Sequence, residues 1–221
     1  MPEEYTGRVS VGGPMDVRRL AGLTIAKLAV GPMSNNAYLI RCTHTDEGLL
    51  VDAAAEPDRL RELVTFEGPP VSAVLTTHRH ADHWQALAET AAFADAATYA
   101  GADDADELPV AVDERLQHGD EITVGDLTLE VIQLRGHTPG SVALLYRDPD
   151  GTPHLFTGDS LFPGGVGRTT TPENFRSLID DVESRVFDVL PDETWFYPGH
   201  GDDSTLGAER PHLGEWRSRG W

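Results

Sequence analysis

A segment of four metal-binding side chains constrains this chain more than any other feature. Residues 77–83 read T-H-R-H-A-D-H and hold His78, His80, Asp82 and His83. An apolar run precedes the segment and a helical pattern follows it. Because side chains alternate along a strand, His78 and His80 share one face, and the turn that follows returns the other two to the same space. Imidazole and carboxylate suit zinc, iron or manganese, so the segment predicts a metal site where a strand gives way to a helix.

Three further side chains stand in the same context. His137 lies in G-H-T-P-G-S, Asp159 in T-G-D-S and His200 in P-G-H-G, and each follows an apolar run. Glycine or proline braces each of them, and functional residues gather on loops that a scaffold holds. With the first segment they supply five histidines and two aspartates. That number fits two metal ions that share one bridging carboxylate.

The remaining pattern predicts a mixture of strands and helices. We expect strands over residues 23–30, 37–42, 49–52, 71–76, 121–124, 127–134, 142–147, 154–156 and 194–197. We expect helices over residues 57–66, over 84–93 and from about 172, where apolar side chains recur with helical spacing. Residues 101–120 are acidic and predict a loop with a little strand. We therefore expect a flexible N-terminal arm over residues 1–20 and a single domain over 21–221, with sheets covered by helices.

Composition excludes several classes of function. The 221 residues hold 17 Lys+Arg against 37 Asp+Glu, a net charge of −20, which repels nucleic acid and anionic membranes. Lys27 is the only lysine, so a lysine nucleophile has almost no candidate. Cys42 is the only cysteine, which excludes an internal disulfide framework and favours a reducing compartment. Without a membrane-spanning run or a signal-peptide pattern, we expect a cytoplasmic protein.

The metal-binding residues, in this order, resemble the motifs of the metallo-β-lactamase superfamily over roughly residues 23–209. The resemblance implies an αββα sandwich, with two sheets face to face, helices outside and the metals at one edge. It implies a first divalent metal ion held by His78, His80 and His137. It implies a second held by Asp82, His83 and His200, with Asp159 bridging the two.

Details select a branch of that superfamily. True β-lactamases lack the bridging Asp159, the diiron oxygen-reducing branch has Glu in place of His80, and nuclease branches carry extra domains and basic surfaces. What remains resembles the glyoxalase II group of thioester hydrolases. The stretch G-G-V-G-R that ends at Arg168 is similar to that group's G-x-G-[K/R] element, and Asn36 and Tyr38 to its N-x-Y element. Asp52 matches an aspartate that supports the site without binding metal.

The resemblance implies a hydrolytic mechanism on a small-molecule substrate. Two divalent ions, zinc first and iron or manganese as alternatives, make hydroxide available for attack on a thioester or ester carbonyl. Asp82 holds and orients that hydroxide, and Arg168 binds an anionic group of the substrate. Glyoxalase II proper adds a helical C-terminal domain that grips glutathione. Only 21 residues follow His200 here, as in small bacterial single-domain members, so the expected protein lacks that grip.

Three alternatives stay open at this point. Persulfide dioxygenases share these motifs but use a single iron ion held by two histidines and one aspartate. A lactonase would use the same centre on a lactone, without releasing a thiol. A metal-bound scaffold or sensor would bind metal without turnover. Metal count, oxygen uptake and thiol release distinguish these functions. We expect the other histidines to lie at the surface or in loops: His44, His118, His154 and His212.

Overall fold

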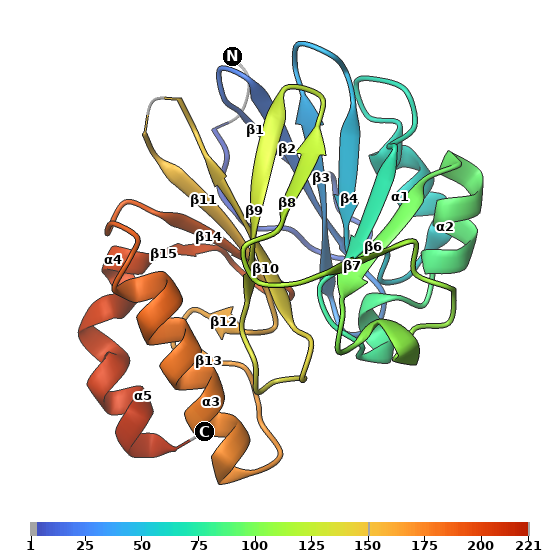
Figure 1. The fold of residues 1–221 in the computed structure, drawn as a ribbon. Coiled ribbons are helices and arrows are strands. Elements are labelled where there is room, and N and C mark those ends of the chain that lie inside the picture. Colours follow the sequence, from blue (N-terminus) through green and yellow to red (C-terminus); the bar gives the residue numbers. More distant parts are fainter. Residues whose placement is uncertain (1–3, 150, 221) are drawn as a thin grey trace.

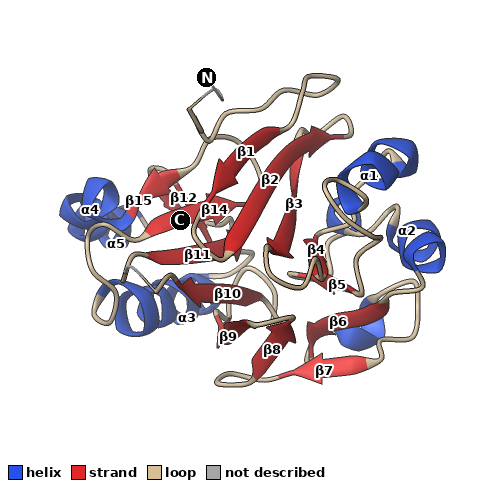
Figure 2. Cartoon of the chain, turned by 90° about the horizontal axis from the view of Figure 1, so that it is seen from above, coloured by secondary structure: helices blue, strands red, loops and turns tan. Residues whose placement is uncertain are grey.

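Two β-sheets lie face to face, with helices on both outer sides (Figures 1 and 2). The structure is a computed structural model that describes residues 4–149 and 151–220. It has the αββα arrangement that the resemblance to the metallo-β-lactamase superfamily implies (Figure 1). Among the described residues, no helix combines the length and the apolar character needed to cross a bilayer.

The first sheet contains seven strands in the order of the sequence. They are β1 (Asp16–Arg19), β2 (Leu23–Val30), β3 (Asn35–Cys42), β4 (Gly48–Val51), β5 (Ala73–Thr76), β6 (Ala97–Gly101) and β7 (Glu114–Leu116). Strands β1 to β4 pair antiparallel, and β4 to β7 pair parallel. Parallel neighbours require long crossover connections. Helices α1 (Pro57–Val64) and α2 (Leu87–Ala94) lie in two of these connections and cover the outer face of the sheet (Figure 2).

The second sheet has the order β15-β14-β11-β10-β9-β8. Its strands are β8 (Glu121–Val124), β9 (Leu127–Gln133), β10 (Val142–Arg147), β11 (Pro153–Gly158), β14 (Trp195–Pro198) and β15 (Ser204–Thr205). A small ribbon, β12 (Leu161–Phe162) and β13 (Gly165–Val166), follows β11. Helices α3 (Pro172–Val182), α4 (Leu206–Glu209) and α5 (Leu213–Arg219) lie on the outer side, and a π-helical turn (Glu183–Phe187) continues α3.

The α3 helix shows how the sequence pattern becomes packing. The Thr171 side chain caps its first turn by accepting a hydrogen bond from the Asn174 amide at 3.1 Å. Its apolar stripe is buried against the second sheet, as the helical spacing predicts: Phe175, Leu178, Ile179, Val182 and Val186. Between the sheets, side chains of both form one core, in which Tyr38 meets Phe156 and Tyr197.

The N-terminal segment differs from the flexible arm that the sequence predicts. Residues 1–3 lie outside the described residues, but β1 pairs with β2 along its whole length. The Asp16 carboxylate accepts hydrogen bonds from the Thr6 amide at 2.9 Å and from the Gly7 amide at 2.8 Å. Polar contacts with distant residues also hold the segment, such as the hydrogen bond from the Tyr5 hydroxyl to Asp203, so an apolar pattern in the sequence does not reveal its order.

Two further boundaries differ from the sequence prediction. Residues 81–83 form a 3₁₀ turn, and the helix predicted from residue 84 begins at Leu87. Residues 101–120 contain β7 and a short 3₁₀ turn (Ala105–Glu107), so the expectation of loop with a little strand is confirmed.

Candidate metal centre

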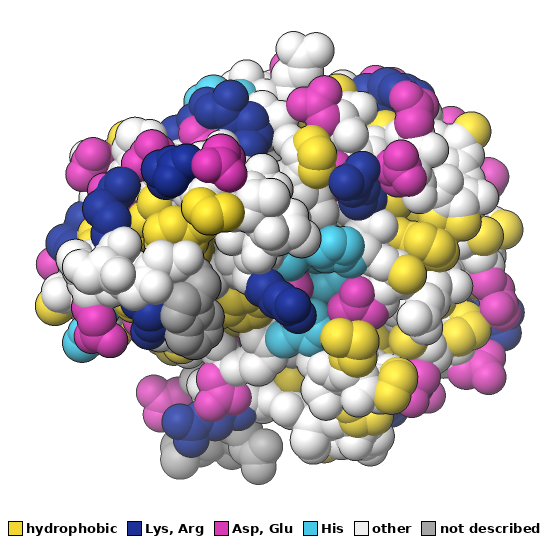
Figure 3. Space-filling view, turned by 90° about the horizontal axis from the view of Figure 1, so that it is seen from below, with side chains coloured by type: hydrophobic (Ala, Val, Ile, Leu, Met, Phe, Trp, Pro, Cys, Tyr) yellow, Lys and Arg dark blue, Asp and Glu magenta, His cyan; other side chains and the backbone are white. Residues whose placement is uncertain are grey.

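The seven predicted ligands meet on one side of the molecule, at an edge of the sandwich (Figure 3). His78, His80, Asp82 and His83 follow β5, and Asp159 and His200 follow β11 and β14, each where its strand ends. His137 lies in the loop between β9 and β10. Figure 3 shows histidine side chains gathered near the middle of this side. The sheets therefore bring together residues that lie up to 122 positions apart in the chain.

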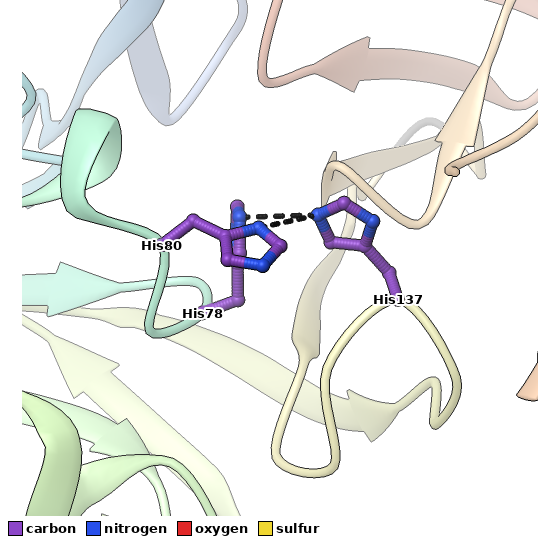
Figure 4. A group of neighbouring side chains, drawn as sticks. All are labelled: His78, His80 and His137. Carbon is purple, nitrogen blue, oxygen red and sulfur yellow. Dashed lines mark hydrogen bonds between the residues drawn. The ribbon is translucent and has the colours of Figure 1, made fainter. Parts of the chain in front are cut away.

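Three histidines form the first group of potential ligands (Figure 4). His137 Nε2 lies 3.3 Å from His78 Nε2 and 2.9 Å from His80 Nδ1. Two nitrogens bound to one tetrahedral zinc ion are about 3.3 Å apart, given a Zn–N bond of about 2.0–2.1 Å. The three nitrogens therefore converge at the spacing that a single ion requires.

A second group lies beside the first. His83 Nε2 is 3.2 Å from His200 Nε2. Asp82 Oδ2 is 3.5 Å from His83 Nε2 and 3.3 Å from His200 Nε2. The Asp159 carboxylate lies between the groups. Its Oδ1 is 3.4 Å from His83 Nε2, and its Oδ2 is 3.7 Å from His137 Nε2. One carboxylate thus faces both groups, as a bridging ligand must.

In His83, His137 and His200, the hydrogen bond made by the outer ring nitrogen, Nδ1, determines whether the inner nitrogen, Nε2, has a lone pair for a metal ion. We assign these protons from the hydrogen-bond partners. Nδ1 of His83 donates to Asp52 Oδ2 at 2.8 Å, Nδ1 of His137 to the Arg168 carbonyl at 2.8 Å, and Nδ1 of His200 to the Met33 carbonyl at 3.1 Å. In the neutral rings, the form that binds a metal ion, the inner Nε2 atoms therefore carry the lone pairs.

His78 follows the same rule. The Thr77 hydroxyl donates to Asp52 Oδ2 at 2.8 Å, so it accepts from His78 Nδ1 at 3.1 Å. Lone pairs facing one another at about 3 Å repel unless a cation lies among them. Asp159 Oδ1 is also buried without a hydrogen-bond partner among the described residues. The donor set therefore fits two divalent cations.

The comparison with protein families agrees with this geometry. The sequence profile described as "Metallo-beta-lactamase superfamily" matches residues 30–200. The chain belongs to this superfamily. The matched region contains all seven ligand positions and most of both sheets.

Individual relatives in the metallo-beta-lactamase superfamily differ in length. The "Probable metallo-hydrolase YqgX" of Bacillus subtilis (strain 168) is 28% identical, over 83% of this chain and 93% of its own length. The "Hydroxyacylglutathione hydrolase-like protein" of Mus musculus is 34% identical over 75% of this chain. This chain spans only 57% of the mouse protein. The crystal structure of ETHE1 from Myxococcus xanthus has a TM-score of 0.76 and 29% identity, covering 88% of this chain and 84% of that one.

The predicted supporting residues lie in different surroundings. Asp52 is buried, and its carboxylate accepts hydrogen bonds from the Thr77 amide, the Thr77 hydroxyl and His83 Nδ1. Arg168 is exposed, and its backbone carbonyl holds His137. A substrate contact of the Arg168 guanidinium stays a prediction.

Sequence reasoning missed two residues at the metallo-beta-lactamase centre. Asn35 Nδ2 donates to Asp82 Oδ2 at 2.9 Å, and Arg79 lines a pocket beside the first group. Neither stands in a Gly/Pro-braced strand end, so the pattern used for the ligands could not find them. Of the histidines expected at the surface, His154 is instead buried on β11, where its Nδ1 lies 2.9 Å from the Tyr197 hydroxyl. The apolar run that contains His154 was the feature of the sequence that could have predicted its burial.

The charges around His83 predict that metal binding releases protons. Burial disfavours a charge on His83, but the carboxylates of Asp52 and Asp159 outweigh it and raise its pKa to about 10. The raised pKa favours a second proton on the metal-free ring, at Nε2, and a metal ion that binds there must displace it. We expect the affinity of the second group for zinc to fall as the pH falls from 8 to 6, by up to about tenfold per unit for this proton. Calorimetric titration with zinc in buffers of different ionisation enthalpy measures the release; binding without proton release would contradict the expectation.

Proposed function

We propose that the chain is a binuclear metal-dependent hydrolase of thioester or related ester substrates. Zinc is the metal we expect first, with iron or manganese as alternatives. The observation that carries the proposal is the pair of adjacent ligand groups facing one shared carboxylate, Asp159. The mouse relative, a hydroxyacylglutathione hydrolase-like protein, supports the thioester class.

The residues around the centre have separate roles in this reaction. Two bound divalent ions would lower the pKa of water enough to supply hydroxide near neutral pH and would polarise the substrate carbonyl. Asn35 Nδ2 donates a hydrogen bond to Asp82 Oδ2 and so fixes the Asp82 carboxylate, which would hold and orient the attacking water. Asp52 holds both His83 and Thr77, and so keeps the ligand rings in place.

A pocket beside the first ligand group is the proposed substrate site. It has a volume of about 390 Å³ and is lined by His80, His137, Arg79, Arg135 and Asp103, among others. Arg135 is already held by Asp181 in a two-point ion pair, with both nitrogen–oxygen distances 2.9 Å. Among the described residues, the carboxylate oxygens that face the Arg79 guanidinium lie farther away, at 3.8 and 3.9 Å. Arg79 is therefore better placed than Arg135 to bind an anionic group.

Replacing either candidate arginine, Arg79 in the pocket or the exposed Arg168, should separate anionic from neutral substrates. We expect Arg79→Gln and Arg168→Gln each to raise KM for a carboxylate-bearing thioester by about tenfold or more, because a charge-assisted hydrogen bond contributes about 1.5–3 kcal/mol. The KM for the matched carboxamide thioester should stay unchanged. Steady-state kinetics on the two substrates measure the difference. Arg176→Gln is the control, since Arg176 pairs with Glu173 on the exposed face of α3. An arginine whose replacement changes neither KM has no part in binding substrate.

The proposed function is tested by a panel of substrates on the metal-loaded enzyme. Thioesters, lactones and a persulfide are assayed for thiol release, ring opening and oxygen uptake. Thiol release from thioesters with two metal equivalents would support the proposal. Oxygen uptake on the persulfide with one equivalent of iron would replace it with the dioxygenase alternative. Because the chain spans little more than half of the mouse relative, glutathione is not assigned as the thiol.

The proposal extends to the setting of the enzyme. Residues 21–221 would form one domain, since the two sheets share a core. The single buried thiol of Cys42 favours a reducing, cytoplasmic location. The net charge of −20 makes nucleic acid and anionic membranes poor partners, so a small molecule is the expected substrate.

A further inference from the structure

The only lysine of the chain is fully buried. The other sixteen basic residues are arginines, yet Lys27 on β2 has no exposed surface. Its ammonium group donates to three oxygens: the Gly7 carbonyl at 2.7 Å, the Gly201 carbonyl at 2.8 Å and Asp203 Oδ1 at 2.6 Å. A compact ammonium has three donors for three converging acceptors, whereas a planar guanidinium does not match this arrangement. The three acceptors therefore fit a lysine better than an arginine, although every other basic residue of the chain is an arginine.

The three acceptors belong to two separate segments. Gly7 lies in the N-terminal segment, whereas Gly201 and Asp203 lie in the loop between β14 and β15. The same Asp203 carboxylate accepts from the Tyr5 hydroxyl at 2.6 Å and from Trp195 Nε1 at 3.0 Å. Lys27 thus joins residues 5–7 to the loop through polar contacts closed off from water.

That loop carries one ligand of the second group. His200 directly precedes Gly201, whose carbonyl Lys27 holds. From the other side, Asn36 Nδ2 donates to the same Gly201 carbonyl at 2.9 Å. Residues of the first group, His78, His80 and His137, lie outside this loop. A change at Lys27 should therefore reach the second group of ligands and leave the first in place.

We propose that Lys27 is a positioning residue for the second metal site, and that residues 5–7 are a structural part of that site. Without the ammonium group, the buried Asp203 carboxylate and two carbonyls lose their common partner, and an unpaired buried charge is costly. The element able to move is the loop, because Gly201 and Asp202 are exposed. His200 Nε2 lies 3.3 Å from Asp82 Oδ2 and 3.5 Å from Asp159 Oδ2. Movement of the loop would displace His200 from both carboxylates.

The test compares two buried cations on neighbouring strands. Arg41 on β3 is 2% exposed and donates to backbone carbonyls of Phe66, Val64 and Pro69. It lies at the end of β3 away from Asn35, so Arg41→Met also removes a buried cation from several carbonyls but leaves the His200 loop intact. Both variants should lose thermal stability, which makes Arg41→Met a matched control for a merely structural role.

The readout is metal binding, so it does not depend on the thioester proposal. In titrations with Co²⁺ followed by visible absorption and by metal content, we expect Lys27→Met to bind one equivalent as wild type does. Its affinity for the second equivalent should fall at least tenfold. Arg41→Met should bind both equivalents with wild-type affinities. Wild-type affinity for the second ion in Lys27→Met, or equal losses in the two variants, would overturn the proposal.

A milder variant covers the case in which Lys27→Met does not fold. Tyr5→Phe removes only the hydroxyl that donates to Asp203 Oδ2. We expect it to fold and to weaken binding of the second Co²⁺ ion in the same direction by a smaller factor, with the first ion unaffected. An unchanged second affinity in folded Tyr5→Phe would show that residues 5–7 are not part of the site.

Discussion

Asp159→Ala is expected to abolish binding of the metal pair and to lower kcat/KM by about a thousandfold or more. The Asp159 carboxylate faces ligands of both groups, so its loss removes a ligand from each. Loss of a residue that merely supports a ligand costs about 10–100-fold in metal affinity or activity, and loss of a shared ligand should cost more. Metal content per chain and steady-state kinetics measure the two effects together.

The control for Asp159→Ala is another aspartate away from the site. Asp126 is exposed on the turn between β8 and β9, and Asp126→Ala should keep both metal ions and full activity. His80→Ala provides a comparison within the site, because it removes a ligand of the first group only. We expect it to lower the affinity for the first ion and to lower hydrolysis with it. Full activity in Asp159→Ala or His80→Ala would contradict the binuclear account.

Gly199→Ala is expected to lower metal content below one equivalent and activity by about a hundredfold or more. A Cβ atom at this position would lie 2.2 Å from Asp159 Oδ1 and 2.8 Å from His83 Cε1. The backbone cannot easily move away. The Gly199 amide donates to the Gly158 carbonyl at 2.8 Å, and the Gly199 carbonyl accepts from the Asn36 amide at 2.7 Å. The new methyl group must therefore displace the ligands themselves.

A second glycine separates this effect from a general loss of stability. Gly214 lies in α5, and a Cβ atom there meets open space, so Gly214→Ala should leave metal content and activity unchanged. Circular dichroism checks that Gly199→Ala is folded. A folded Gly199→Ala protein with two metal equivalents would show that the centre tolerates displacement of Asp159, against the geometry described here.

The candidate ligands could be picked out from the sequence because each stands in a recognisable local pattern, and the structure brings them together. His137, Asp159 and His200 each follow an apolar strand and stand beside glycine or proline, and the T-H-R-H-A-D-H segment holds four candidate ligands at one turn. The strands themselves follow from apolar runs. The pattern of strands and helices predicts sheets covered by helices, and the αββα arrangement is what the resemblance to the metallo-β-lactamase superfamily implies.

The supporting contacts could not be predicted because their partners are distant in the chain. Lys27 and Asp203 are 176 positions apart, and Tyr5 and Asp203 are 198 apart. Nothing in the polar sequence of residues 4–15 predicts the hydrogen bonds to Lys27 and Asp203 that hold this segment in place. Arg79 stands between two ligands in the motif, but only the folded chain shows the pocket that it lines.

The measurement that tests the central claim most directly is the metal content of the chain. Protein purified without added metal or chelator is analysed by mass spectrometry for metal equivalents per chain. The two ligand groups and the Asp159 carboxylate between them predict close to two equivalents of zinc, iron or manganese. One equivalent, all iron, would contradict the binuclear hydrolase and favour the oxygen-dependent alternative.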